Sequence, residues 1–458
     1  MFDSTFWFKT FELLLSLSIL VFIHELGHFM WARIFKVGVE KFYLFFDAKD
    51  FALVRWNKKG LHLLDLVHFP KLVNPTETEY GIGWVPLGGY CAIVGMIDET
   101  HDAESADMDR PDAFVKQGKF AQFMIMVGGV LNNVILAVII YVGMAWHWGK
   151  DILEPQNLPY GVAYSQLAHS IGFEDGDVVI ATDGKPLQDY NGLGSALLLA
   201  NDVTVQRGGQ QVLITLPDTL GTHFLSNKEE LATFVTMRFP MVIDQLVEDG
   251  AAKAAGLQVG DSIVMCDSIP LPYFHQFKQY VSQHAGDTLQ VAFYRADSLM
   301  TLSAVVGTNG MLGVAPRMLI GAECITHLEY TFLESIPVGI ERGWNMLYNY
   351  VRQFKLVFTK QGAKELGGFG SMGSIFPEQW IWKAFWSLTA FISVALAFMN
   401  ILPIPALDGG HVMILIIEAI IRRPLSNKVK DTLQYIGFGF IVLLMIAVNA
   451  NDIIKFFF

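Results

Sequence analysis

Charged residues are scarce in this chain: Asp, Glu, Lys and Arg make up only 17% of its 458 residues, while 52% are hydrophobic. Such a composition is too apolar for an ordinary soluble protein and predicts a membrane protein that carries some soluble mass. Basic residues are also in the minority, and the net charge is −12. This net charge argues against nucleic-acid binding, for which a basic patch would be expected, and we predict no nucleic-acid partner.

Cysteine is nearly absent. The chain has only Cys91, Cys266 and Cys324, and these show neither zinc-finger spacing nor a disulfide framework. The small-residue cleavage site of a secretory signal peptide is also missing after the apolar N-terminal stretch. We therefore predict that this stretch is retained as a membrane span.

Four stretches are long and apolar enough to cross a bilayer, at about residues 7–31, 121–146, 384–405 and 433–450. Lys and Arg gather in the loop between the first two spans and in the loop between the last two. Because positive charge beside spans marks the cytoplasmic side, we expect these two loops to be cytoplasmic. Both termini and the large segment 147–383 would then face the other side.

The first span contains a His-Glu-x-x-His motif, His24 to His28. On a helix the two histidines lie one turn apart on one face, so both can bind one metal ion, and Glu25 is placed to act as general base. An ionisable residue at bilayer depth costs at least ~2.5–3.5 kcal/mol and is expected to be functional. The alternatives at this point are a zinc site and a purely structural polar cluster, which a third ligand would distinguish.

A third ligand is available where the third span ends. Pro403 and Pro405 break the helix within the membrane, and Asp408 follows them. Its carboxylate is suited to complete a His-His-carboxylate set around Zn²⁺. Asp408 could instead cap the following helix, and His411 is assigned a supporting or structural role. The apolar piece from Val412 to Ile421 is too short to span the membrane.

Residues 81–96 are apolar, rich in glycine and free of charge. They are too short for a spanning helix and predict a strand or hairpin at membrane depth, where such backbone must be buried in protein or line a cavity. A plain interfacial loop is the alternative. The preceding residues 48–80 are charged and mixed, and we expect loop or interfacial structure there.

The segment between the second and third spans contains an internal repeat: residues 171–180 resemble residues 255–264. Each copy has Gly-Asp before a short β-branched run, which is typical of a turn that leads into a strand. The pattern resembles a tandem pair of PDZ domains over 155–235 and 236–316, with a chance repetition of a common turn as the alternative. A PDZ-like groove can bind an extended peptide by strand addition or merely occupy space.

These motifs together resemble the site-2 protease family of intramembrane zinc metalloproteases, and in particular its bacterial members with tandem PDZ domains. The resemblance rests on His24 to His28, on the stretch from Asn400 to Gly409 and on the PDZ pair. It implies an α-helical membrane protein with about four transmembrane helices, a membrane-embedded β-loop and two inserted PDZ-like domains. The membrane parts would be 1–146 and 384–458, with a helical connector at 317–383.

The resemblance also implies the site. Zn²⁺ would be held by His24, His28 and Asp408, with Glu25 as the catalytic base. The implied substrate contacts are Gly88, Gly89 and Tyr90 of the β-loop, Asn133 of the second span and Asn400 of the third. The chain departs from the family pattern at three places: Val130 and Phe369 each replace a proline, and Phe45-Phe46-Asp47 stands where Gly-Phe-Gly is usual.

The implied activity is hydrolysis of peptide bonds within the transmembrane segments of single-pass membrane proteins. The substrates would resemble anti-sigma factors already cut by another protease, or remnant signal peptides. The protein would lie in the bacterial inner membrane, in contact with lipid, with its PDZ-like domains in the periplasm. A silent PDZ scaffold and a metal transporter are the other classes that the residues leave open.

Overall fold

The computed structural model describes residues 4–86, 88–96, 109–154, 157–158, 160–187, 189–248, 250–317, 325–359, 362 and 366–457. Leu87 of the predicted β-loop, Cys324 and the first two residues of the predicted 155–235 domain lie outside these ranges. The chain divides into two compact units, Met1–Gly149 with Glu329–Phe458 and Lys150–Leu328. We call them the membrane unit and the inserted unit.

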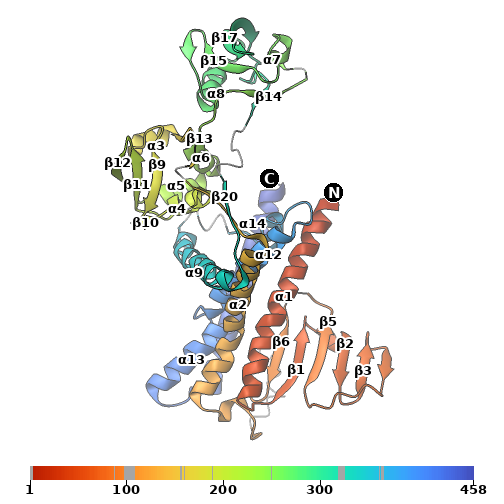
Figure 1. Ribbon diagram of the computed structural model, residues 1–458. Helices are drawn as coiled ribbons and strands as arrows, with labels where there is room; N and C mark the ends of the chain where they lie inside the picture. Colours follow the sequence, from red (N-terminus) through yellow and green to blue (C-terminus); the bar gives the residue numbers. More distant parts are fainter. Residues whose placement is uncertain are drawn as a thin grey trace. The chain divides into compact units, whose positions relative to one another are not determined.

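Four helices of the described residues are long and apolar enough to cross a membrane. They are α1 (Ser4–Ile34), α2 (Lys119–Trp148), α12 (Trp382–Ile401) and α14 (Asn427–Phe457). In Figure 1, α1, α2 and α12 lie side by side, and α2 packs against both of its neighbours. The four predicted spans are confirmed as long apolar helices, so the protein is a membrane protein.

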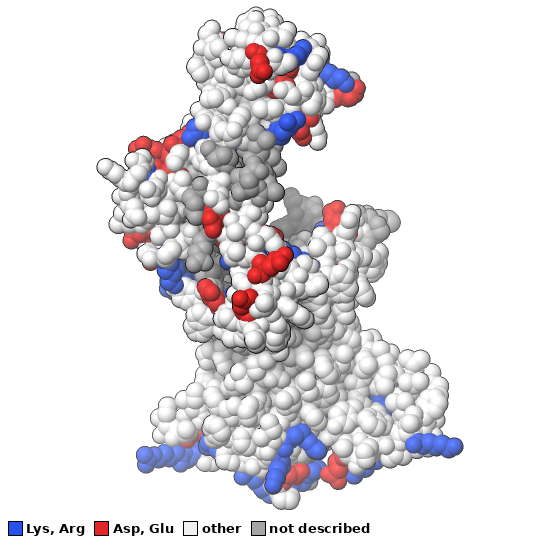
Figure 2. All heavy atoms as spheres, viewed as in Figure 1, with Lys and Arg blue, Asp and Glu red and all other residues white. Residues whose placement is uncertain are grey.

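Lys and Arg side chains line one end of the membrane unit, beyond a broad band of uncharged surface (Figure 2). This is the end at which α1 finishes and α2 begins, marked by Arg33 and Lys119. The pattern matches the charge asymmetry on which the predicted orientation rests.

The third predicted span is shorter than expected. α12 ends at Ile401, so residues 402–405 at the end of the predicted span are not helical. Pro403 and Pro405 lack the backbone N–H that a continuing helix needs. A turn then leads into α13 (Asp408–Ile421), which at 14 residues is too short to cross the bilayer, as predicted.

A six-stranded sheet follows α1 in the membrane unit. Its strands are β1 (Val39–Leu44), β2 (Ala52–Asn57), β3 (Gly60–Leu63), β4 (Val67–Phe69), β5 (Glu79–Gly83) and β6 (Tyr90–Ile93). The order is β4-β3-β2-β5-β1-β6, so within the described part of the chain β6 is an edge strand paired with β1 alone. Figure 1 shows the sheet beside α1, and Phe29 of α1 contacts Phe42 of β1.

The strand predicted within residues 81–96 is present as β6, but the hairpin offered beside it is not, because β5 and β6 flank β1 instead of pairing with each other. Residues 48–80, for which we expected loop or interfacial structure, contain β2, β3, β4 and the start of β5 rather than a plain loop. The charged residues that suggested a loop are neutralised by ion pairs: Arg55 lies 3.3 Å from Asp65 and 3.8 Å from Glu79. Because these charged side chains are paired within the sheet, they interrupt the alternation of polar and apolar residues by which the strands could be recognised in the sequence.

The inserted unit is built from two similar halves. The first has β9 (Val178–Thr182), β10 (Lys185–Pro186), β11 (Asp202–Arg207) and β12 (Gln210–Thr215) in the order β10-β9-β11-β12. The second has β15 (Ser262–Cys266), β16 (Ile269–Pro270), β17 (Thr288–Arg295) and β18 (Ser298–Val305) in the equivalent order β16-β15-β17-β18. The repeat seen in the sequence is thus a repeat of topology.

Smaller elements complete this unit. Three two-stranded sheets pair β8 (Val162–Tyr164) with β13 (Val235–Met237), β14 (Ile243–Leu246) with β19 (Val314–Pro316), and β7 (Lys150–Leu153) with β20 (Ile325–Leu328). The helices are α3 (Gln166–Ile171), α4 (Leu193–Leu197), α5 (Leu220–Ser226), α6 (Lys228–Phe234), α7 (Ala251–Ala254) and α8 (Phe274–Gln283).

The same buried ion pair recurs in both halves. Asp177 and Asp261, each 1% exposed, accept hydrogen bonds from Arg207 and Arg295 respectively. Although burial alone would raise the pKa of Asp261, the Arg295 guanidinium and the backbone N–H of Gln258 lower it overall. Each arginine ties the end of one strand to the Gly-Asp turn, which explains why that turn recurs in the sequence.

Among the described residues, the sequence between the inserted unit and α12 includes a longer and a shorter helix of the membrane unit. The longer is α9 (Phe332–Val357), which begins with a capping box formed by Thr331 and Glu334. It packs closely on α2, because a Cβ at Gly339 would lie 2.5 Å from the backbone nitrogen of Val142. The shorter is α11 (Phe369–Ser374), whose backbone donates hydrogen bonds to Asp452 of α14.

Candidate metal centre

Glycines bring α1 and α2 into close contact at the His-Glu-x-x-His motif. A Cβ at Gly27 would lie 2.2 Å from the carbonyl oxygen of Gly128. A Cβ at Gly129 would lie 2.5 Å from Nε2 of His28 and 2.6 Å from Cε1 of His24. Because no side chain fits at either place, α2 can lie directly over the face of α1 that carries both histidines.

Three potential metal ligands meet at this crossing. The Nε2 atoms of His24 and His28 are 3.2 Å apart, and Oδ2 of Asp408 lies 3.1 Å from the first and 3.5 Å from the second. Among the described residues they form the one cluster of three or more His, Cys, Asp or Glu side chains with metal-binding spacing. The fold thus joins α1 to the first residue of α13, almost 400 positions later in the chain.

The donor set fits Zn²⁺. Two imidazole nitrogens and one carboxylate oxygen are ligands of a kind that catalytic zinc sites use. Oδ2 of Asp408 is buried, faces both nitrogens and has no hydrogen-bond partner in the described part of the chain. A buried carboxylate oxygen without such a partner is costly unless a cation neutralises it. Gly129 leaves the space beside the nitrogens open.

Polar groups of α2 orient both histidine rings. Nδ1 of His28 lies 2.8 Å from the carbonyl oxygen of Ile125 and donates its proton to it, which leaves Nε2 as the free donor atom. Nδ1 of His24 lies 3.4 Å from the amide nitrogen of Asn133, whose own oxygen is buried with no hydrogen-bond partner among the described residues. Rotating that amide by 180° brings the oxygen to Nδ1, where it accepts the proton. Both rings then present Nε2 to Asp408.

The two alternatives for the third ligand have clear outcomes. Asp408 is not the N-cap of α13: that position belongs to Leu407, and no side-chain cap bond is formed. His411 lies outside the cluster, with its Nε2 2.8 Å from the amide nitrogen of Gln434 in α14. The geometry therefore favours Asp408 over His411 beside the histidines.

The structure places some of the predicted substrate-binding residues at the metal centre and others in the sheet. Asn400 reaches the centre, with its amide nitrogen 3.4 Å from Nε2 of His24. The segment that enters β6 lies against α1, since a Cβ at Gly89 would be 3.4 Å from Cγ of Glu25. Gly88 adjoins the Phe46 ring, and Tyr90 directs its ring into the sheet rather than toward the histidines.

Two features of the centre were missed in the sequence. One is the backbone carbonyl of Ile125, which no side-chain pattern can reveal. The other is Gly129, although a signal existed: glycine in a helix interior costs roughly 0.5–1 kcal/mol relative to alanine, so a Gly-Gly pair within a span calls for a packing reason.

The site combines two histidines, a carboxylate and an adjacent glutamate between membrane helices. This combination is typical of one class of protein, the membrane-embedded metal-dependent hydrolases. The sequence profile of peptidase family M50 matches residues 12–62 and 66–444. The chain therefore belongs to peptidase family M50. The predicted resemblance to site-2 proteases and the prediction of a zinc metalloprotease are both confirmed at the level of the family.

Named relatives align along nearly the whole chain. The regulator of sigma E protease of Haemophilus influenzae is 26% identical over 469 residues, which cover 96% of this chain and 98% of that protein. The regulator of sigma-E protease RseP of Salmonella typhimurium is 26% identical over 96% of this chain and 97% of its own length. A Vibrio cholerae protein provisionally named a zinc metalloprotease has the same identity and coverage.

Proposed function

We propose that the protein is an intramembrane zinc endopeptidase that cuts transmembrane segments of single-pass membrane proteins. The observation that carries this proposal is the meeting of His24 and His28 with Asp408 beside Glu25, at the crossing of α1 and α2, which are long enough to cross a bilayer. The names of the relatives, regulator of sigma E protease and zinc metalloprotease, agree with it.

The three residues would hold Zn²⁺, which when bound would supply Lewis acidity for the activation of water and of a peptide carbonyl. Glu25, one residue after His24, takes the proton from the attacking water and delivers it to the leaving nitrogen. Asn400, whose amide lies at His24, is placed to donate a hydrogen bond to the backbone of the substrate. Asn133 and the Ile125 carbonyl keep the imidazoles in the required orientation.

The substrate must be extended when it is cut. A transmembrane helix satisfies its peptide groups internally, so the scissile bond becomes accessible only after local unwinding. The unwound segment then needs new hydrogen-bond partners, and an edge strand offers them. β6 is an edge strand whose entry segment lies beside Glu25, which supports strand addition at residues 88–94.

Strand addition is tested with Ala92→Pro and Ile93→Pro. Adjacent residues of a strand direct their N–H groups to opposite sides, so one variant removes a donor to β1 and the other removes a donor on the free side. Zinc content should stay at wild-type level while cleavage of a membrane substrate falls sharply. Full activity in both variants would argue against pairing at β6.

We further propose that the inserted unit is a PDZ pair in the periplasm of a bacterium, with the membrane unit in the inner membrane. The equivalent sheets of its two halves and the basic end of the membrane unit support this arrangement. The pair would exclude substrates that still carry a bulky ectodomain, because bulk alone suffices for exclusion. Capture of a newly exposed C-terminus is the alternative.

Replacing residues 155–316 by a flexible linker separates the two roles. Exclusion predicts that an untrimmed substrate is now cut, because the barrier is gone. Capture predicts that the trimmed substrate is cut more slowly and the untrimmed one remains intact. Both rates are measured on the same linker variant, with the wild-type protein as reference.

A metal transporter and a silent scaffold make different predictions from a peptidase. The purified protein should contain one zinc per chain and cut a single-pass substrate in detergent or vesicles. Zinc uptake without cleavage would favour transport, and neither zinc nor cleavage would favour a scaffold.

A further inference from the structure

We propose that Asp47 is a positioning residue that fixes Tyr90 at the start of β6 and thereby sets which peptide bond of an added strand lies at the metal centre. The inference rests on the proposed function. It concerns the register in which the substrate strand pairs with β6. Asp47 belongs to Phe45-Phe46-Asp47, one of the places where the chain departs from the glycine pattern of its family.

The segment Phe45-Phe46-Asp47 lies at the end of β1 and joins two parts of the sheet. Phe46 forms a bridge with Val85, with the two backbone hydrogen bonds between them at 3.2 Å. Phe45 adopts a positive φ of 68°, a conformation that favours glycine and costs energy for a bulky residue. Strain of this kind persists when surrounding contacts hold it in place, so the segment is firmly anchored.

Tyr90, the first residue of β6, is held by this segment. Its hydroxyl donates a hydrogen bond of 2.8 Å to Oδ1 of Asp47. Its ring stacks on Phe46, at a centroid distance of 6.0 Å and 7° between planes, and on Tyr43, at 5.3 Å and 13°. Tyr90 is 6% exposed, so these contacts leave its ring little freedom to move.

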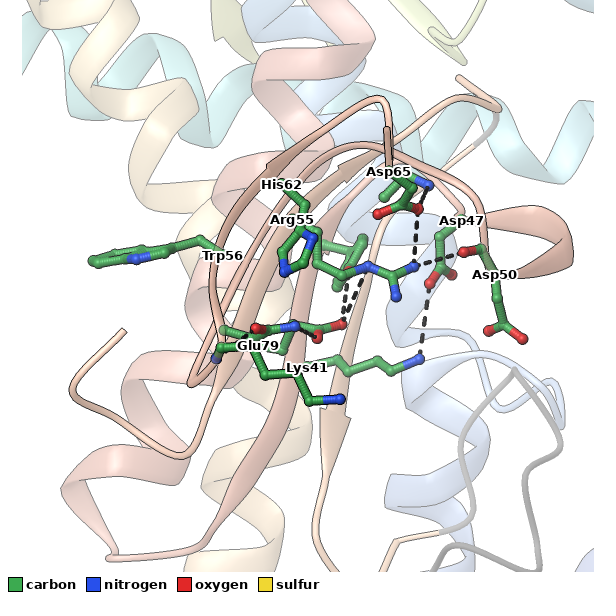
Figure 3. A network of polar contacts seen from close by, with 12 residues as sticks. Lys41, Asp47, Asp50, Arg55, Trp56, His62, Asp65 and Glu79 are labelled. Atoms are coloured by element: carbon green, nitrogen blue, oxygen red, sulfur yellow. Dashed lines mark hydrogen bonds and ion pairs between the residues drawn. The ribbon is translucent and has the colours of Figure 1, made fainter. Parts of the chain in front are cut away.

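Asp47 is itself fixed from the body of the sheet. Nζ of Lys41 lies 3.7 Å from Oδ2 of Asp47, and the hydroxyl of Tyr43 donates to Glu79 at 2.7 Å. Glu79 adjoins Arg55, which also contacts Asp65 (Figure 3). The carboxylate that accepts the hydrogen bond of Tyr90 is thus paired with Lys41 of β1, beside the separate Tyr43, Glu79 and Arg55 contacts of the same sheet.

The stretch of chain between Tyr90 and the metal centre is short and consists of glycine. Gly88 has a φ of 156° and packs against the Phe46 ring, and Gly89 lies against Glu25. Two glycines permit many backbone conformations, so they cannot by themselves hold β6 at one height beside Glu25. The backbone pairing of β6 with β1 holds the strand in register, and the Asp47–Tyr90 bond adds a side-chain constraint at its first residue, next to the glycines.

Loss of the constraint has a specific consequence for cleavage. A strand that slips along an edge by one residue turns all its side chains to the opposite face, so slippage that keeps the same faces moves by two residues. Variants that free Tyr90 should therefore cut at the original bond and also at a bond two residues away. A residue that only stabilises the fold would lower the amount of active protein without adding a second cut.

The test uses the full-length protein and a single-pass substrate, with product termini identified by mass spectrometry. Tyr90→Phe keeps the stacked ring and removes the hydroxyl, and Asp47→Ala removes the acceptor. Both should retain wild-type zinc content and yield a second product, cut two residues away from the original bond. Their kcat/KM should fall by about two- to tenfold, the range of one lost hydrogen bond. Asp47→Asn keeps an acceptor oxygen and should restore the single product.

The matched control is Tyr80→Phe in β5. For the Tyr80 hydroxyl the structure gives no hydrogen bond to another described residue, and its ring packs on Phe42 and Trp56. It should cut at the wild-type bond at the wild-type rate. If Tyr90→Phe and Asp47→Ala cut the same single bond as wild type with unchanged kcat/KM, this inference is overturned while the proposed function stands. If the zinc-loaded wild type cuts no membrane substrate, both are overturned.

Discussion

A single methyl group on α2 should abolish the metal centre. In Gly129→Ala the new Cβ would lie 2.5 Å from Nε2 of His28 and 2.8 Å from Nδ1 of His24. Carbon and nitrogen atoms in ordinary contact are at least ~3.4 Å apart, so the rings or the helix must move by about 0.9 Å. Zinc sites tolerate deviations of only about ±0.2 Å in ligand distance, so the displaced rings cannot bind zinc as before.

The expected result is a folded, inserted protein that has lost most of its zinc and at least ~10²-fold in cleavage rate, the cost of misplacing a catalytic group by about 1 Å. Zinc is measured by inductively coupled plasma mass spectrometry on the purified protein, and cleavage on a single-pass substrate. Gly143→Ala is the matched control, because it makes the same change in α2 at a place where the Cβ meets nothing within 4 Å. It should keep zinc and activity.

The two variants together test the geometry. If Gly129→Ala binds one zinc per chain and cuts at the wild-type rate, the close approach of α2 to the histidines is not part of the centre. If Gly143→Ala also loses zinc, the loss follows from any added methyl group on α2, and the steric argument fails.

The remaining predictions concern the third ligand and the inserted unit. Asp408→Ala should lose zinc and activity, whereas His411→Ala should keep zinc, since of these two residues only Asp408 lies with the histidines. Stoichiometric zinc in Asp408→Ala, or loss of zinc in His411→Ala, would overturn the choice of Asp408 as third ligand. Arg295→Met should destabilise the inserted unit by roughly 1–3 kcal/mol, because it leaves Asp261 buried with an unpaired charge. The pKa of Asp261 is lowered in the folded state, so this stabilisation is present above about pH 4 and is lost as the pH falls further. The difference in thermal unfolding between the variant and wild type should therefore be larger at pH 7 than at pH 3.

The membrane helices could be predicted from the sequence because each carries its signal locally. Apolar length identified all four, and the i, i+4 spacing placed His24 and His28 on one face of the first. The position of Asp408 followed from the two prolines that end α12, although its distance from the histidines depends on how α13 packs.

The sheet could not be predicted in the same way. Its strands are short, and charges such as Arg55 and Glu79 are paired across neighbouring strands, so the local pattern resembled a loop. The orientation of the histidine rings depends on the backbone carbonyl of Ile125 and on the absence of a side chain at Gly129. The first is a property of a helix crossing, which no single stretch of sequence specifies, whereas the Gly-Gly pair within the span is a signal of close packing.

The most direct test of the central claim is to compare Glu25→Gln with wild type, measuring zinc content and cleavage on the same purified samples. The variant keeps the size and polarity of the side chain and removes the base. We expect one zinc per chain in both proteins and cleavage of a membrane substrate lost by several orders of magnitude in the variant. Cleavage by zinc-loaded Glu25→Gln at a rate near that of wild type would contradict the account.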